Sequence, residues 1–160
     1  MLRFCCLALL TLAAPLAARD SLGIFGEWGA FRDDAPVRCY ALAMPARTSG
    51  SNEFDPYAAV SHWPAQRVRG QVHFRTSRKI GDNARITLRV GRETFTLTGS
   101  DNNAWAQDTR GDADILAAMR SASTMVLSTR DAGGRLFTNT YDLGDVASAI
   151  DAASVGCARS

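Results

Sequence analysis

Cysteine has the most distinctive chemistry among the residues of this sequence. Cys39 and Cys157 are the two that remain if an N-terminal leader containing Cys5 and Cys6 is removed. Neither belongs to a C-x-x-C pair, which argues against a dithiol oxidoreductase or a zinc site. In an exported chain, two remaining cysteines most simply form one disulfide. Two free buried thiols, or one reactive cysteine, are the alternatives.

The two histidines permit a catalytic site without defining one. His62 precedes Trp63 and Pro64, and His73 lies in an alternating polar and apolar segment where a solvated side chain is expected. No Gly-x-Ser-x-Gly motif is present, so a serine hydrolase has no signature here. A hydrolase whose histidine and carboxylate are brought together by the fold is an alternative function, and we assign no catalytic residue.

Acidic residues form no recognisable metal site in the sequence. Asp112 with Asp114, and the run 101–103, lack the spacing and the late glutamate of a calcium loop. Helix capping and a turn explain them better. Residues 133–134, both glycine, lie between two predicted strands and not before a helix, so they do not form a phosphate-binding loop. We expect no metal and no cofactor.

Positive charge is concentrated in one segment of a chain whose net charge is only +2. Residues 67–92 contain eight basic side chains and one acidic side chain. Several of them alternate with apolar residues, so two paired strands would gather them on one face. The candidate anion-binding patch consists of Arg67, Arg69, Arg75, Arg85 and Arg89. Such a patch suits lipopolysaccharide phosphates, acidic lipid headgroups or an acidic partner protein, and the alternative is a solvated arginine-rich surface.

The overall composition limits the class of protein. A chain of 160 residues that is 46% hydrophobic and 21% charged fits one folded domain. No apolar run reaches the roughly 18 residues of a membrane-spanning helix. Nucleic acid is not an expected partner, because exposed aromatic residues interleaved with basic ones are not evident. Trp28, Trp63 and Trp105 lie in or beside apolar segments and are predicted at or near the core.

The N-terminus has the features of a secretory signal. Arg3 provides a basic start, residues 4–12 form an apolar run, and small residues lead to Ala18. We expect cleavage after Ala18, one domain over residues 19–160, and a periplasmic or secreted location.

Alternation of apolar and polar residues predicts a mainly β chain. The predicted strands cover residues 24–31, 37–44, 57–63, 72–76, 85–90, 94–98, 124–129 and 136–141. Glycine-containing turns at 91–92 and 131–134 indicate two hairpins. Many short strands with such turns favour an antiparallel β-sandwich.

Two short helices are expected beside the strands. Asp112 is predicted to cap a helix over residues 112–120. A second helix begins at 146 after a capping Asp145, with an apolar stripe at the spacing of one helix face. Gly156 is expected to end this helix just before Cys157.

Segments spread over residues 24–157 resemble the invasion-associated locus B family of exported proteins from Gram-negative bacteria. The segments that carry this resemblance are 25–28 with Phe31, 38–40, 61–64, 103–106 with 117–120, and 141–144 running on to Ala149 and Cys157. The resemblance implies an immunoglobulin-like β-sandwich, a periplasmic or surface location and no established enzyme activity. We therefore expect a non-enzymatic binding module whose partner is an anionic lipid, lipopolysaccharide, or an envelope or host protein.

Overall fold

The computed structural model describes residues 19–158, so the predicted signal sequence lies outside the described residues. The strands are β1 (Arg19–Phe25), β2 (Trp28–Asp34), β3 (Val37–Ala43), β4 (Arg47–Thr48), β5 (Tyr57–Trp63), β6 (Val68–Arg75), β7 (Ile86–Val90), β8 (Glu93–Ser100), β9 (Asn103–Trp105), β10 (Thr124–Arg130) and β11 (Leu136–Asp142). The helices are the 3-10 helix η1 (Pro64–Gln66), α1 (Thr109–Met119) and α2 (Val146–Ala158).

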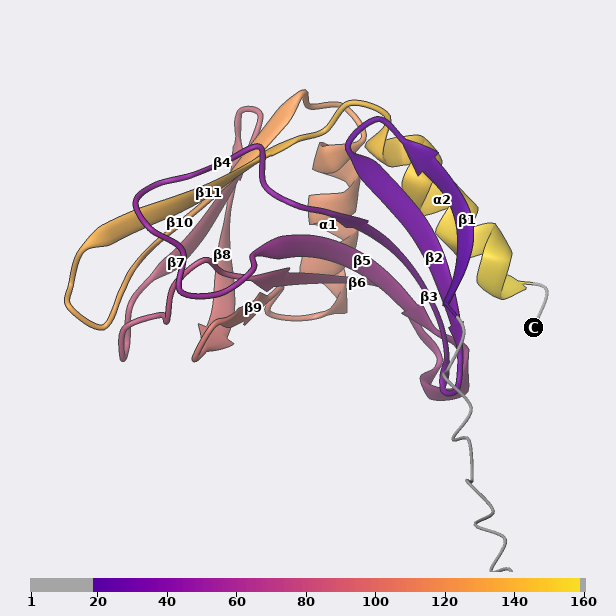
Figure 1. The fold of residues 1–160 in the computed structure, drawn as a ribbon, viewed down its shortest axis with the longest axis horizontal. Helices are drawn as coiled ribbons and strands as arrows, with labels where there is room; N and C mark the ends of the chain where they lie inside the picture. The colour runs from indigo at the N-terminus through magenta and orange to yellow at the C-terminus, as the bar shows by residue number, and fades with distance from the viewer. Residues whose placement is uncertain (1–18, 159–160) are drawn as a thin grey trace, which may run out of the picture.

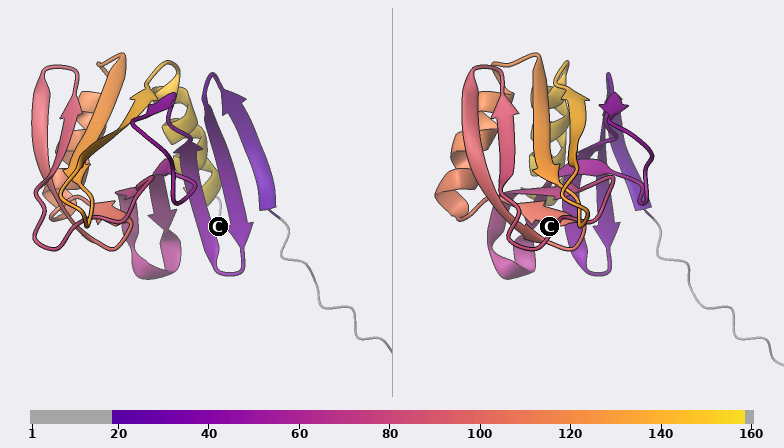
Figure 2. Two further views of the ribbon diagram at one scale, coloured as in Figure 1. Left: turned by 60° about the vertical axis from the view of Figure 1, so that its left-hand side comes forward. Right: turned by 90° about the vertical axis from the view of Figure 1, so that its left-hand side faces the viewer.

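Within residues 19–158 the strands form one antiparallel sheet of eleven, in the order β1-β2-β3-β5-β6-β9-β8-β7-β10-β11-β4. The sheet bends strongly (Figures 1 and 2). Phe74 of β6 and Tyr141 of β11 are not on neighbouring strands, yet their ring centroids are 5.9 Å apart. Parts of the sheet therefore face each other across the core. The mainly β class with two α-helices is confirmed, and this arrangement is consistent with the predicted sandwich.

Both α-helices cover the same face of the sheet. Val72 and Phe74 point inward from β6 and pack with Ile115 of α1, while Ala30 and Cys39 pack with α2. This burial follows from the alternation seen in the sequence. The opposite face of β2, β3, β5, β6 and β9, which we call the outer face, is turned away from both helices.

The predicted strand over residues 24–31 is wrong, because this segment is a hairpin. β1 and β2 are joined by a two-residue turn, with Phe25 paired to Trp28. Gly26 in this turn has a φ of 58°, a left-handed conformation that glycine adopts without strain. Apart from Glu27, the residues on both sides of Gly26 are apolar or small, so this segment resembles one continuous strand in the sequence.

The predicted cap of the first helix is also wrong. Asp108 lies in extended conformation before α1, and its side chain accepts a hydrogen bond from Gly111 N at 2.8 Å. Asp112 lies within the first turn of the helix. Its carboxylate accepts a hydrogen bond from Val72 N at 2.8 Å and thereby attaches α1 to β6.

The final helix extends further than predicted. Its apolar stripe is buried as expected, but Gly156 lies inside α2 and does not end it. A Cβ atom at Gly156 would lie 2.5 Å from Leu22 Cδ1, so the glycine permits close packing of α2 on β1. Before the helix, the main-chain carbonyl of Asp145 accepts a hydrogen bond from Ala149 N at 3.2 Å.

The Cys39–Cys157 disulfide is confirmed. The two sulfur atoms are 2.07 Å apart, and the bond links residues 118 positions apart in the chain. It joins β3 to the last turn of α2 and so fixes the end of the helix against the sheet.

Candidate functional site

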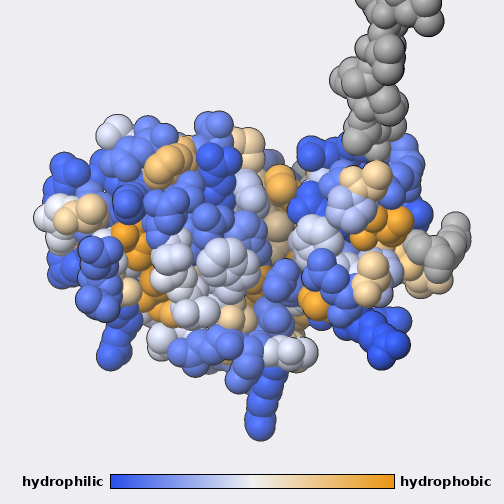
Figure 3. Space-filling model, turned by 90° about the horizontal axis from the view of Figure 1, so that it is seen from below, coloured by the Kyte–Doolittle hydropathy of each residue, from blue (hydrophilic) through white to orange (hydrophobic). Residues whose placement is uncertain are grey.

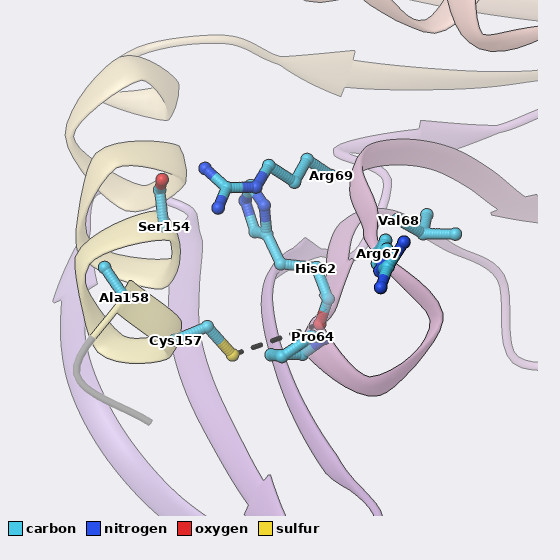
Figure 4. A pocket seen from close by; sticks show the side chains of 8 residues that line it. All are labelled: His62, Pro64, Arg67, Val68, Arg69, Ser154, Cys157 and Ala158. Carbon is cyan, nitrogen blue, oxygen red and sulfur yellow. Dashed lines mark hydrogen bonds between the residues drawn. The ribbon is translucent and has the colours of Figure 1, made fainter.

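A cavity of about 270 Å³ lies where the end of β5 and the start of β6 meet the last turns of α2. Its lining residues are His62, Pro64, Arg67, Val68, Arg69, Ser154, Cys157 and Ala158. Figure 4 shows His62 and Arg69 between the helix and the turn that connects the two strands, with Arg67 and Val68 at the turn itself. The cavity contains two arginines of the predicted patch and one of the two histidines of the chain.

Local sequence explains why these side chains converge. His62 pairs with Cys39 across β5 and β3, directly beside the disulfide. Pro64 opens η1, and Arg67 ends it with a φ of 57°. This tight turn reverses the chain within a few residues. Arg69, near the start of β6, is thereby brought back beside His62, while Arg67 lies at the turn itself (Figure 4).

The far wall of the cavity depends on how α2 is held. Cys157 Sγ lies 4.0 Å from the carbonyl oxygen of His62 and is bonded to Cys39. Arg32 donates a hydrogen bond to the carbonyl oxygen of Gly156 at 2.9 Å. The disulfide and this hydrogen bond hold the last turn of α2 over the end of β5.

His62 has a buried nitrogen with nothing to bind inside the described chain. No hydrogen-bond partner for its Nε2 atom occurs within residues 19–158. Burial, with a further contribution from the positive charge of Arg69, lowers the pKa of His62 below its ordinary value. The imidazole is therefore neutral near pH 7, and a negative charge in the cavity would raise its pKa.

The two arginines of the cavity have uncompensated charge. Neither Arg67 nor Arg69 forms an ion pair with any of the described residues. Figure 4 shows Arg69 extending past the His62 ring toward Ser154, with Arg67 on the η1 side. Guanidinium groups bind the oxygens of phosphate, sulfate and carboxylate with several N–H donors at once. This site has the donors that an oxyanion requires.

The cavity offers no acid to support hydrolysis by His62. Ser154 borders the same space, but none of the described residues that line it carries a carboxylate. A serine and histidine pair without an orienting acid lacks the third member of a catalytic triad.

Over residues 19–158, no three His, Cys, Asp or Glu side chains are placed to hold a metal ion. Neither described α-helix has the length and apolar content of a membrane crossing.

The remaining arginines of the predicted patch lie elsewhere. β6 and β7 are not paired, because β9 and β8 lie between them, so the expected gathering of arginines by two paired strands is wrong. Arg75 of β6 lies over the Phe54 ring at 5.9 Å. Arg85 and Arg89 are exposed at and along β7. Of the five arginines of the predicted patch, all of them within the described residues, Arg67 and Arg69 line the cavity beside His62 and the other three do not.

One further basic residue of this segment has a structural role. Arg78 is 9% exposed and pairs with Asp131 at 3.0 Å, and it also donates a hydrogen bond to the carbonyl oxygen of Ser51 at 3.0 Å. The pair anchors the long loop between β4 and β5 to the β10–β11 turn. A cluster of basic residues in sequence therefore divides into one buried ion pair and several surface groups.

This chain matches no protein-family model, no curated protein and no solved structure. We therefore infer its function from the chemistry of the site itself. Sequence reasoning identified Arg67, Arg69 and His62 but not Ser154, which has no local signal. Its place in the site depends on the docking of α2.

Proposed function

We propose that this protein is a non-enzymatic binding module of the cell envelope that receives an oxyanion, such as a lipid phosphate, in the cavity of His62, Arg67 and Arg69. One observation carries the proposal: within residues 19–158, two arginines that form no ion pair and a buried imidazole nitrogen without a hydrogen-bond partner border the same cavity. The proposed export to the cell envelope is inferred from the N-terminal sequence, which has the features of a secretory signal. Membership of the invasion-associated locus B family remains a prediction.

The dimensions of the cavity favour a small charged group. A volume of about 270 Å³ lies just below the range for small-molecule sites, which is roughly 300–1,000 Å³. It accommodates a phosphate with its attached alcohol but not acyl chains. An inorganic phosphate and a lipid headgroup share this chemistry, so binding experiments must separate the two sources.

Replacing Arg69 with serine is expected to weaken binding of inorganic phosphate about tenfold, because a charge-assisted hydrogen bond contributes roughly 1.5–3 kcal/mol. Isothermal titration calorimetry of the purified protein measures this change. The matched control is Arg89→Ser, which removes an exposed arginine of β7 outside the cavity. Equal losses in both variants would show a diffuse charge effect and contradict the proposal.

Sedimentation with vesicles distinguishes the sources of the phosphate. Phosphatidylcholine vesicles containing phosphatidylglycerol should retain the parent protein, release it when inorganic phosphate is added, and retain the Arg69→Ser variant poorly. Calorimetric phosphate binding without vesicle retention would identify a soluble oxyanion as the ligand. If the protein binds neither inorganic phosphate nor the vesicles, the proposed function is contradicted.

A further inference from the structure

The outer face has a slot that follows from the sequence of β5. The residues of β5 that point to this face are Tyr57, Ala59, Ser61 and Trp63, so two small side chains stand between two large ones. Ala59 and Ser61 form the floor of a hollow of about 290 Å³. His62 points to the other side of the strand, so the slot and the oxyanion cavity are separate (Figure 4).

Neighbouring strands supply the side walls. Ala59 pairs with Leu42 of β3 and with His73 of β6, and Ser61 pairs with Tyr40 of β3. Each small residue is therefore flanked by a larger one on the adjacent strand, which turns a flat sheet face into a depression. Seen from below Figure 1, the molecule presents mostly blue hydrophilic side chains with pale and orange ones among them (Figure 3).

One part of the slot is cationic. Arg19 and Arg38 both line it, and they share a single carboxylate: Asp33 lies 3.4 Å from Arg19 and 2.8 Å from Arg38. One positive charge therefore remains uncompensated by this pair of contacts. Arg38 is also held in position over the Tyr40 and Trp63 rings, at 4.1 and 5.0 Å from their centroids.

The other part of the slot is aromatic. Tyr57 contacts the edge of His73 with ring centroids 5.5 Å apart, and His73 stacks on Trp105 at 5.0 Å. His73 is thus half-buried and not the solvated side chain expected from sequence. Its Nε2 atom lies 2.9 Å from Asn103 Oδ1, which fixes the ring orientation. Rigid aromatic walls of this kind favour a flat apolar group.

From this juxtaposition we infer that the slot binds a small aromatic carboxylate, with its ring against Leu42, Tyr57 and His73 and its carboxylate toward Arg19 and Arg38. A cavity of roughly 150 Å³ holds benzene, so a slot of about 290 Å³ accommodates one ring with a short acidic side chain. The ligand therefore needs both a carboxylate, for the arginine end of the slot, and a ring, for the aromatic end. The inference stands whether or not the oxyanion cavity binds phosphate.

Titration of the purified protein with phenylacetate tests this assignment. The chain has two histidines, so their ring proton resonances report on the two sites separately in NMR spectra. Phenylacetate is expected to shift the His73 signals in a saturable manner and at lower concentrations than any shift at His62, where only the carboxylate could bind. Acetate, which lacks the ring, and benzyl alcohol, which lacks the charge, are each expected to bind at least about tenfold more weakly. Equal binding of either probe would overturn the assignment.

Two variants locate the ligand. Ala59→Leu fills the floor of the slot and should weaken phenylacetate binding at least about tenfold, whereas Thr87→Leu on β7, away from the slot, should not change it. Arg19→Ser removes a side chain that is 60% exposed, so folding should be retained while affinity falls several-fold. Circular dichroism verifies folding of each variant. Unchanged affinity in folded Ala59→Leu, or in Arg19→Ser if Ala59→Leu does not fold, would overturn the inference.

Discussion

Replacing both cysteines, in the double variant Cys39→Ser with Cys157→Ser, is expected to lower the free energy of unfolding by about 2–5 kcal/mol relative to the parent protein. The bond closes a loop across 118 positions and constrains the unfolded chain, which is the main source of disulfide stabilisation in the chain-entropy account. Phosphate affinity should fall as well, because Cys157 holds the last turn of α2 beside His62. Urea denaturation followed by circular dichroism gives the first quantity and calorimetry the second.

Ser154→Ala is the control for this variant, since Ser154 is an exposed residue in the same part of α2 and its replacement leaves the disulfide intact. Its urea midpoint should match that of the parent protein. Reduction of the parent protein with a dithiol should reproduce the loss seen in the double variant. An unchanged midpoint after removal of both cysteines would mean that the apolar face of α2 suffices to hold it.

Trp28→Ala is expected to cost about 3–5 kcal/mol of folding free energy, the range for removing a large aromatic side chain from a core. Trp28 is fully buried at the start of β2, and its indole N–H donates a hydrogen bond to the carbonyl oxygen of Asp142 at 2.8 Å. The residue therefore connects the N-terminal hairpin to the segment that leads into α2. Equilibrium unfolding in urea measures the loss.

Two further variants separate the contributions of Trp28. Trp28→Phe keeps most of the ring but removes the N–H donor, so it should cost roughly 1–3 kcal/mol by leaving the Asp142 carbonyl without this partner. Ile24→Ala changes a side chain that is 68% exposed and should be nearly neutral. If Trp28→Ala costs no more than Ile24→Ala, the description of the core is incorrect.

Local periodicity predicted those parts of the fold where one face of a strand is buried. Val72 and Phe74 of β6 and the three apolar residues of β7 are buried as their alternation indicates, and the turns at 91–92 and 131–134 form hairpins. The prediction failed where the signal was a single residue. Gly26 alone marks the turn between β1 and β2, and Asp108 and Asp112 are equally plausible helix caps by composition.

The candidate site was less predictable because it depends on tertiary docking. A basic segment shows that charge is abundant, but not which strands are adjacent. The insertion of β9 and β8 between β6 and β7 separates Arg75 from Arg89. The proximity of Ser154 to His62 arises only when α2 folds back onto β5. The cysteine pair was the one long-range contact that sequence identified, because disulfide chemistry leaves few alternatives.

The pH titration of the two histidines with and without sulfate tests the oxyanion cavity most directly. Sulfate remains a dianion while histidine titrates, so only the protein changes its charge. A bound dianion beside His62 offsets the burial and the Arg69 charge that depress the pKa of this residue, so it should raise that pKa. Linkage then requires sulfate affinity to increase as the pH falls through the pKa of His62.

The predicted result is a sulfate-dependent rise in the pKa of His62, with His73 unchanged and no rise in the Arg69→Ser variant. An equal change at both histidines, or none at His62 in saturating sulfate, would contradict the account.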